Sequence, residues 1–599
     1  MKTFNKIIIA TVLFLGLVGC SGNESKIVKT EEFEDHGFTV IRATMKNESR
    51  LLFVVQKNNP QEVEVYSDYD QTLKGDLVIP EKVTCNKTTY KVTSIGEEAF
   101  EFSDLTSVNL PNSITRIGEE AFYGCRNLTS IVIPNCVSII GPYAFDECEA
   151  LASITIPSGL TIIESGVFGG CKALSSITIP ENVNSIGGEA FMECEALSSI
   201  AIPNSVTMIG NNAFNNCCNL TSITIPNSVS RIEPGVFGGC KALSSIIIPE
   251  SVNYIGKGAF GGCESLSSVT IPNNVASIDP YAFSGCTNLN SISVSEGNTR
   301  YDSRNNCNAI IETSSATIIQ GCINTKIPES IISIGEGAFS ECDKLTSIII
   351  PNSVTNIGEN AFANCKGLSS INIPNSICEI GNLAFMECEN LNSVTISNGV
   401  NSIGEQAFVG CKKLSSIIIP QSVLSIGEGA FNYCTGLTSV IIQNPYLSFD
   451  YENVFIGCDN LQPQNIVFND TNAQYYESDY GNVADRLPKE YEWILGEWKG
   501  VDFKGDLAII SRDGIVFNNA VRSALLDEME PNKAELTKQT YEIKKTNYDF
   551  DNKEYMSIVV NGDSKHFRDG EAAYYLDLKS KVIFYFYDFD QKITLKKVK

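Results

Sequence analysis

Hydrophobic and polar residues recur with a period of 23 positions through most of this chain. Each unit opens with Leu, Ile and Ile at its positions 1, 4 and 6, with polar residues between them, which predicts a short strand with one inward face. A Pro follows in most units, and it ends the strand because it lacks the N–H that a ladder needs. Val and Ile three residues apart, then Ala-Phe and Cys, supply further inward groups from a turn and a short helical or 3₁₀ segment.

Phe marks the period, at positions 122, 145, 168, 191, 214, 237, 260 and 283, and again at 339, 362, 385, 408 and 431. One unit cannot bury its apolar residues alone, whereas stacked neighbours build a continuous core. A period of 20–29 residues headed by this strand pattern is typical of leucine-rich repeats. The sequence therefore predicts a repeat solenoid of short parallel β-strands joined by turn and 3₁₀ segments.

The copies resemble the BspA-like leucine-rich-repeat surface proteins, through the motif I-P-x-S-V-x-x-I-G-x-x-A-F-x-x-C between residues 73 and 462. The resemblance implies a cell-surface or secreted protein that binds host matrix proteins or epithelial cells. In several bacteria proteins of this family are outer-membrane lipoproteins, so the resemblance also implies that location. The family supplies no catalytic residues, and its members differ in ligand, so the resemblance does not identify one.

The N-terminus has the pattern of an export signal. Lys2 and Lys6 precede an apolar run from Ile7 to Leu17, which is too short to span a bilayer but suits a signal peptide. Leu17-Val-Gly-Cys20 resembles a lipobox, which predicts a signal peptide over 1–19 and an acylated Cys20 on a tether over 20–29. The alternative is an ordinary signal peptide with a chance Cys. We expect a cell-surface-exposed outer-membrane lipoprotein.

Other segments flank or interrupt the period. Alternating runs over 30–72 predict a small β cap on the first open edge of the solenoid, and 85–90 is expected to be a loop in the first repeat. Between Phe283 and Phe339 the spacing exceeds two units by ten residues. A hairpin insert at about 295–327, turning at Glu312–Ala316, accounts for the excess, either as a structural joint or as a protruding contact element.

After residue 462 the repeat stops. Residues 463–490 are polar and predict a linker, and 491–599 contain short strand patterns that predict an all-β domain. Leu495-Gly-Glu-Trp498 resembles the start of lipocalin-like barrels, so both a lipocalin-like barrel and a β-sandwich stay open.

Charge and composition exclude several functions. The formal net charge is −26, and removal of the leader with its two Lys leaves −28, so nucleic acid is not an expected partner. Only His36 and His566 are present, which disfavours chemistry that needs a His pair. Fourteen of the 21 Cys share one repeat position, where coil spacing of about 5 Å exceeds the Cβ separation of a disulfide and favours buried thiols. We expect no cofactor, no metal site and no enzyme.

Candidate binding residues lie on the outward positions of the strand. Position 3 is Ser in all fourteen copies, which fits either hydroxyls that hydrogen-bond along the ladder or a flat polar binding strip. Position 5 varies, as expected of residues that determine which ligand is bound. Aromatic residues and Arg, which are frequent at binding hot spots, are missing from it. The predicted ligand-binding residues on this concave face are Asn109, Thr155, Thr178, Thr224, Ile247, Thr270, Ile349, Asn372, Thr395 and Ile418.

Two functions follow from these patterns. The first is a lipid-anchored, adhesin-like surface protein whose solenoid binds a protein ligand, host matrix or another surface protein, or a glycan, and which meets the membrane through its lipid alone. The second is a structural stalk that presents a C-terminal β domain, which binds a glycan or small molecule. A hydrolase within 490–599 is the least favoured alternative.

Overall fold

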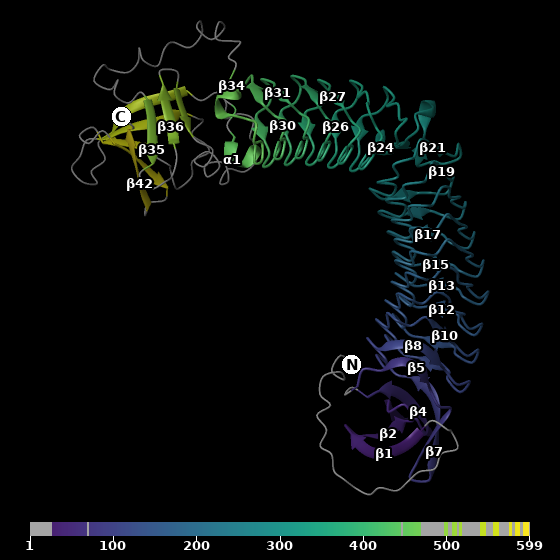
Figure 1. Ribbon diagram of the computed structural model, residues 1–599. Coiled ribbons are helices and arrows are strands. Elements are labelled where there is room, and N and C mark those ends of the chain that lie inside the picture. Colours follow the sequence, from purple (N-terminus) through teal and green to yellow (C-terminus); the bar gives the residue numbers. More distant parts are fainter. Residues whose placement is uncertain are drawn as a thin grey trace. The chain divides into compact units, whose positions relative to one another are not determined.

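The structure, a computed structural model, describes residues 27–68, 71–444, 447 and 449–468, together with the backbone of eight strands between 496 and 597. The predicted signal peptide, Cys20, most of the tether and most of the linker lie outside the described residues. Within the described part of the chain, no helix has the length and apolarity needed to cross a membrane. The predicted solenoid and N-terminal β sheet are both present (Figure 1).

The N-terminal sheet begins with four antiparallel strands in chain order: β1 (Ile27–Asp35), β2 (Phe38–Met45), β3 (Arg50–Gln56) and β4 (Asn59–Ser67). β4 then pairs in parallel with β7 (Thr88–Ile95), whose other partners are β6 (Lys82–Cys85) and the first short strand of the solenoid. One continuous apolar cluster runs from Ile41 in this sheet to Cys322 in the solenoid. The sheet therefore closes the first coil by extending its core.

The turns of the solenoid, here called coils, form two rows of short parallel strands, which we call ladders. The first ladder is interrupted at the coils that begin with Leu151, Leu174, Leu243 and Leu345, where no strand is formed beyond an isolated bridge between Ser153 and Ser176. The first ladder uses the predicted Leu-Ile-Ile segment: β5 (Lys74–Val78), β8 (Asp104–Asn109), β10 (Ser130–Val132), β14 (Ser199–Ile200), β16 (Ser222–Ile223), β19 (Ser268–Ile271), β21 (Ser291–Val294), β27 (Ser370–Ile373), β29 (Ser393–Ile396), β31 (Ser416–Ile419), β33 (Ser439–Ile442) and finally β34 (Ile466–Phe468). Paired residues on neighbouring coils are 23 apart, as in Ser107 and Ser130, so each residue stacks on its counterpart.

The second ladder was not predicted from the sequence. It lies at the Val-x-x-Ile segment and consists of β9 (Arg116–Ile117), β11 (Ile139–Ile140), β12 (Ile162–Ile163), β13 (Ser185–Ile186), β15 (Met208–Ile209), β17 (Arg231–Ile232), β18 (Tyr254–Ile255), β20 (Ser277–Ile278), β25 (Ser333–Ile334), β26 (Asn356–Ile357), β28 (Glu379–Ile380), β30 (Ser402–Ile403) and β32 (Ser425–Ile426). In each strand the Ile points into the core and the preceding residue points outward.

The Ala-Phe-x-x-Cys segment consists of consecutive turns in the described coils, and the predicted helical or 3₁₀ segment is wrong there. Two residues per coil take left-handed backbone angles, such as Glu120 (φ 51°) and Gly124 (φ 65°), and such residues do not continue a right-handed helix. Helices in the described residues occur elsewhere: α1 (Tyr451–Val454), η1 (Arg304–Asn306) and η2 (Pro463–Asn465).

Stacked phenylalanines form the centre of the core. Ring centroids of neighbouring Phe lie 5.0 to 6.0 Å apart, from Phe100 to Phe283 and from Phe339 to Phe455. The rings are nearly parallel, which is within the range of favourable aromatic pairs. Because the 23-residue period places identical side chains above one another, each Phe has the same surroundings as the next.

The insert that interrupts the period contains β22 (Tyr301–Asp302), β23 (Ile310–Glu312) and β24 (Thr317–Gln320), paired antiparallel in that order. β24 pairs in parallel with β25, so the insert continues the second ladder. On its other side the Tyr301 hydroxyl accepts a hydrogen bond from the Ile278 N–H at 3.0 Å. The buried Gln320 amide donates to the carbonyls of Gly321 and Ala338. These contacts support the joint rather than the protruding element.

The C-terminal strands are β35 (Gly496–Gly500), β36 (Asp506–Ser511), β37 (Gly514–Phe517), β38 (Thr540–Thr546), β39 (Tyr555–Asn561), β40 (Tyr574–Asp577), β41 (Val582–Tyr587) and β42 (Gln591–Lys597). They pair antiparallel in the order β37-β36-β35-β42-β41-β40-β39-β38. Their side chains and the segments between them lie outside the described residues, so the choice between a sandwich and a barrel stays a prediction.

Candidate binding face

All ten predicted ligand-binding residues lie on the exposed side of the first ladder, in one row that follows the stacking direction. They are Asn109, Thr155, Thr178, Thr224, Ile247, Thr270, Ile349, Asn372, Thr395 and Ile418. The segment places them there because its residues alternate between core and solvent, both where it forms a strand, as at Thr270, and where it does not, as at Ile247. The apolar members Ile247 and Ile349 are 83% and 85% exposed. We call this row, together with the position-3 serines beside it, the first face.

The position-3 serines do not form a hydrogen-bonded ladder. Ser107 donates to Asp76 Oδ1 at 2.6 Å, and this bond together with one from Thr106 lowers the pKa of Asp76. Among the described residues, the hydroxyls of the other thirteen, from Ser130 to Ser439, have no hydrogen-bond partner. Their donors and acceptors are therefore available to solvent or to a ligand, which favours the interpretation as a polar binding strip.

The hydroxyl groups that join neighbouring coils lie one residue earlier. At position 2, Thr129 donates to the Thr106 carbonyl at 2.9 Å, and Thr438 donates to the Ser415 carbonyl at 3.0 Å. Such bonds satisfy carbonyl groups at the edge of each short strand. The structural use of Ser and Thr on this face thus belongs to position 2.

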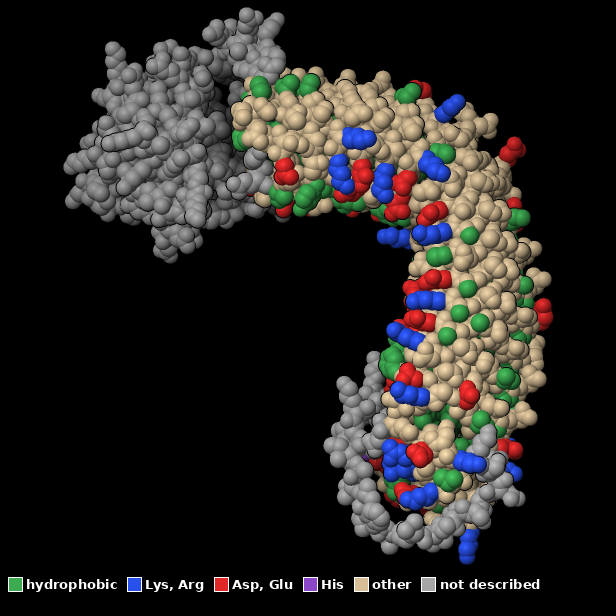
Figure 2. All heavy atoms as spheres, in the orientation of Figure 1, with side chains coloured by type: hydrophobic (Ala, Val, Ile, Leu, Met, Phe, Trp, Pro, Cys, Tyr) green, Lys and Arg blue, Asp and Glu red, His purple; other side chains and the backbone are tan. Residues whose placement is uncertain are grey.

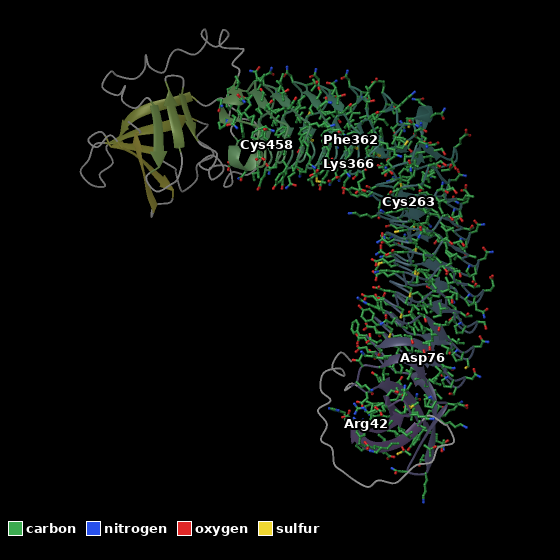
Figure 3. The ribbon with its side chains drawn as sticks, viewed as in Figure 1. Arg42, Asp76, Cys263, Phe362, Lys366 and Cys458 are labelled. Carbon is green, nitrogen blue, oxygen red and sulfur yellow. The ribbon has the colours of Figure 1, made fainter. Side chains whose placement is uncertain are left out.

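The repeated cysteines form a buried row of free thiols. Thirteen of the fourteen donate a hydrogen bond to the Phe carbonyl of the preceding coil, as Cys263 does to Phe237 at 3.2 Å and Cys458 to Phe431 at 3.0 Å (Figure 3 labels both cysteines). The exception is Cys342, which follows the insert. The same Phe carbonyl also accepts a hydrogen bond from the Cys N–H in its own coil, as Phe237 does from Cys240. The thiol therefore adds a second donor, from the next coil, to this buried acceptor. Burial raises the pKa of the Cys125 thiol to about 12 and that of Cys388 to about 12, which keeps both thiols protonated at neutral pH.

The residue after the repeated Cys alternates in charge from Arg126 to Glu195 and again from Asp343 to Lys412, and Figure 2 shows basic and acidic groups alternating along one edge of the solenoid. Lys172 lies 3.3 Å from Glu149, and Lys412 lies 3.0 Å from Glu389 (atoms Nζ and Oε1). Exposed pairs of this kind contribute about 0–1 kcal/mol each. Their effect is to keep successive coils in register rather than to create a charged site.

Carboxylates gather on the first coils without forming a metal site. Burial, and then the neighbouring carboxylates, raise the pKa of Glu98 and Glu120, and burial raises that of Asp146 to about 6. Across the described residues, no group of His, Cys, Asp and Glu has the arrangement needed to hold a metal ion. This region therefore offers negative charge.

A family model described as "BspA type Leucine rich repeat region (6 copies)" matches residues 93–218, 207–322, 320–438 and 357–480, which together exceed half of the chain. The chain belongs to the BspA type leucine-rich repeat family. The resemblance predicted from the repeat motif is confirmed by this match. No curated protein matches the chain closely enough to indicate a relative.

Several solved structures are similar to this BspA type chain. A leucine-rich cell surface protein from Faecalibacterium prausnitzii A2-165 is 25% identical, covering 75% of this chain and 98% of its own, with a TM-score of 0.38. A leucine-rich repeat protein from Bacteroides ovatus ATCC 8483 is 26% identical, covering 67% and 95%, with a TM-score of 0.38. The pneumococcal vaccine antigen PcpA is 18% identical, covering 72% and 86%, with a TM-score of 0.31.

The buried thiols of this BspA type repeat make a direct prediction for alkylation. In the folded protein we expect iodoacetamide to label the exposed Cys136 and Cys378, and not Cys263 or its buried equivalents, even at about pH 9. After unfolding in guanidinium, all should be labelled without any reductant, because the described cysteines form no disulfide. Peptide mass spectrometry gives the labelled positions, and labelling of Cys263 in the folded chain would contradict a closed core.

Proposed function

We propose that this chain is an adhesin-like binding protein of the cell surface, anchored by acylation of Cys20 in an outer membrane. Its solenoid presents the first face to a protein ligand, either host matrix or another surface protein, or to a glycan. The observation that carries the proposal is the first face itself, where thirteen of the fourteen serine hydroxyls have no partner among the described residues and position 5 varies from coil to coil. The Faecalibacterium structure, described as a cell surface protein, agrees with this location.

The face has few of the side chains that dominate tight interfaces, since Trp, Tyr and Arg are missing from position 5. Binding would therefore be weak for one coil and would gain from contact along many coils and from many anchored copies. This favours an elongated ligand such as a matrix fibre or a glycan chain, which can contact several coils at once.

The decisive experiment compares two sets of substitutions in the full chain against one panel of host matrix proteins and glycans at physiological salt. We expect Thr178→Arg, Thr224→Arg and Thr270→Arg together to weaken binding about tenfold or more, because three long side chains block the first face. The matched control replaces the exposed Asn135, Asn204 and Asn227 with Arg in the turn after the first ladder. Equal loss in both sets would exclude the first face as the binding surface.

The alternative function is a stalk that presents the C-terminal strands to a glycan or small molecule. The observation that favours it is the separate sheet after the repeats, in which β35 to β42 pair only with one another. Removal of residues 469–599 distinguishes the two functions. Binding that survives this deletion and is lost in the Arg variant supports the adhesin, whereas the opposite result supports the stalk.

A further inference from the structure

A second exposed row, on the second ladder, has a different composition from the first face. The outward residues of five consecutive coils are Arg116, Ile139, Ile162, Ser185 and Met208, which we call the apolar strip. Register pairs place Arg116 beside Ile139, and Ser185 between Ile162 and Met208. The three apolar side chains are 51%, 41% and 55% exposed. At about 4.8 Å per coil the strip is roughly 20 Å long, the length of about six residues of extended chain.

The solenoid itself does not need apolar residues at this position. The inward Ile of each strand already fills the core, and in later coils the outward residue is polar. These later residues are Ser277, Ser333, Asn356, Glu379, Ser402 and Ser425. The exposed apolar residues of the first face stand apart from one another, as Ile247 and Ile349 do, and single exposed apolar residues are ordinary. Adjacent ones at one end of one ladder are not explained by folding.

Arg116, at the first end of the strip, is an exposed cation that forms no ion pair with any described residue. The other six arginines that the structure describes each form an ion pair with a carboxylate, as Arg126 does with Glu147. Beyond the other end, Arg231 pairs with Glu233 at 2.7 Å and lies over the Tyr254 ring at 3.9 Å. The unpaired charge is thus confined to the Arg116 end.

We propose that the apolar strip is a docking surface for a short linear segment of another protein, with apolar side chains beside an Asp or Glu. The apolar side chains cover Ile139, Ile162 and Met208, and the carboxylate pairs with Arg116. Arg and Met are enriched at protein interfaces, and Arg is a frequent hot spot. The inference rests on the proposed binding function and adds to the first face a second surface, on the second ladder, that recognises a short protein segment.

The test uses the full chain and a library of random peptides of about twelve residues displayed on phage. Peptides that bind should combine acidic and apolar residues. Their affinity should fall about tenfold or more in Ile139→Ser/Ile162→Ser/Met208→Ser, and also in Arg116→Gln. Ser is already the natural residue at this position in five other coils, so the triple variant is expected to fold, which its melting temperature checks.

The matched control is Ile247→Ser/Ile349→Ser/Ile418→Ser, which removes three exposed apolar side chains from the first face. Affinity within about twofold of the unmodified chain is expected there. The proposal is overturned if peptide binding depends equally on both faces, or if no peptide prefers the unmodified chain over the strip variant. It is also overturned if the strip instead holds a second copy of the chain, seen as a dimer that the strip variant abolishes. Failure of the matrix panel with success of the peptides would reject the first-face function alone.

Discussion

Replacement of Phe362 by Ala is expected to lower the free energy of unfolding of the solenoid by about 3–5 kcal/mol. The Phe362 side chain is fully buried, and its ring lies 5.0 Å from that of Phe339 and 5.2 Å from that of Phe385. The stack cannot close over the cavity, because backbone hydrogen bonds to the coils on either side fix the coil spacing, as between the Phe362 N–H and the Ala384 carbonyl. Urea unfolding followed by circular dichroism measures the loss.

The control for this substitution is Phe102→Ala, since that ring is 57% exposed and lies at the surface against Tyr123. We expect a loss below about 1 kcal/mol there. Hydrogen exchange in Phe362→Ala should accelerate in the coils next to residue 362 before distant coils, because a solenoid transmits stability through neighbouring repeats. Equal losses of unfolding free energy in the two variants would mean that the Phe stack is not the main source of stability in the core.

The second large effect is expected in the N-terminal sheet, where Asp68→Ala should cost about 3–5 kcal/mol. The Asp68 side chain is 3% exposed, and its Oδ2 lies 3.1 Å from Arg42 Nε and 3.2 Å from Arg50 Nε (Figure 3 labels Arg42). These contacts are close ion pairs, although neither has the alignment of a hydrogen bond. Removal of the one carboxylate leaves two partly buried cations without their shared counter-ion.

The comparison for Asp68→Ala is Asp104→Ala, whose carboxylate is 47% exposed and lies 3.2 Å from Lys74. A loss of less than about 1 kcal/mol is expected at this exposed pair. Urea unfolding of the full chain measures the loss, and limited proteolysis shows whether cleavage within residues 27–95, the region of the sheet, becomes faster. The Asp68→Asn variant keeps the shape and the acceptor oxygen of the side chain but removes its charge. If this variant were as unstable as Asp68→Ala, the negative charge would be the main contribution of Asp68 to stability.

Much of the solenoid could be predicted from the sequence because every residue stacks on its own counterpart. A 23-residue period therefore fixes which residues meet, and the alternation in the first strand placed all ten candidate residues on the exposed side. The second ladder escaped prediction because each of its strands is two residues long and leaves only one Ile facing inward. Strand periodicity needs more residues than that to be recognised.

The turns of the Ala-Phe-x-x-Cys segment, which follow the second ladder, could not be predicted from the sequence pattern either. Left-handed backbone angles occur at Glu120, Tyr143 and Leu383 as well as at glycines, so residue type gave no signal that a helix is interrupted. The loop expected at 85–90 is shorter than predicted, since Asn86 and Lys87 alone turn the chain between β6 and β7. The hydrogen-bonding state of the position-3 serines depends on distances between coils, which no single repeat reveals.

The Phe, Cys and strand ladders have one more consequence, for how the gene can change. Because each coil contacts its neighbours through the same residues, deletion or duplication of one whole 23-residue unit leaves matching surfaces on both sides of the new junction. Recombination between repeats thus alters the length of the solenoid in fixed steps, without unfolding it. Lineages that carry this gene are expected to differ in repeat number more readily than in the residues of a single coil.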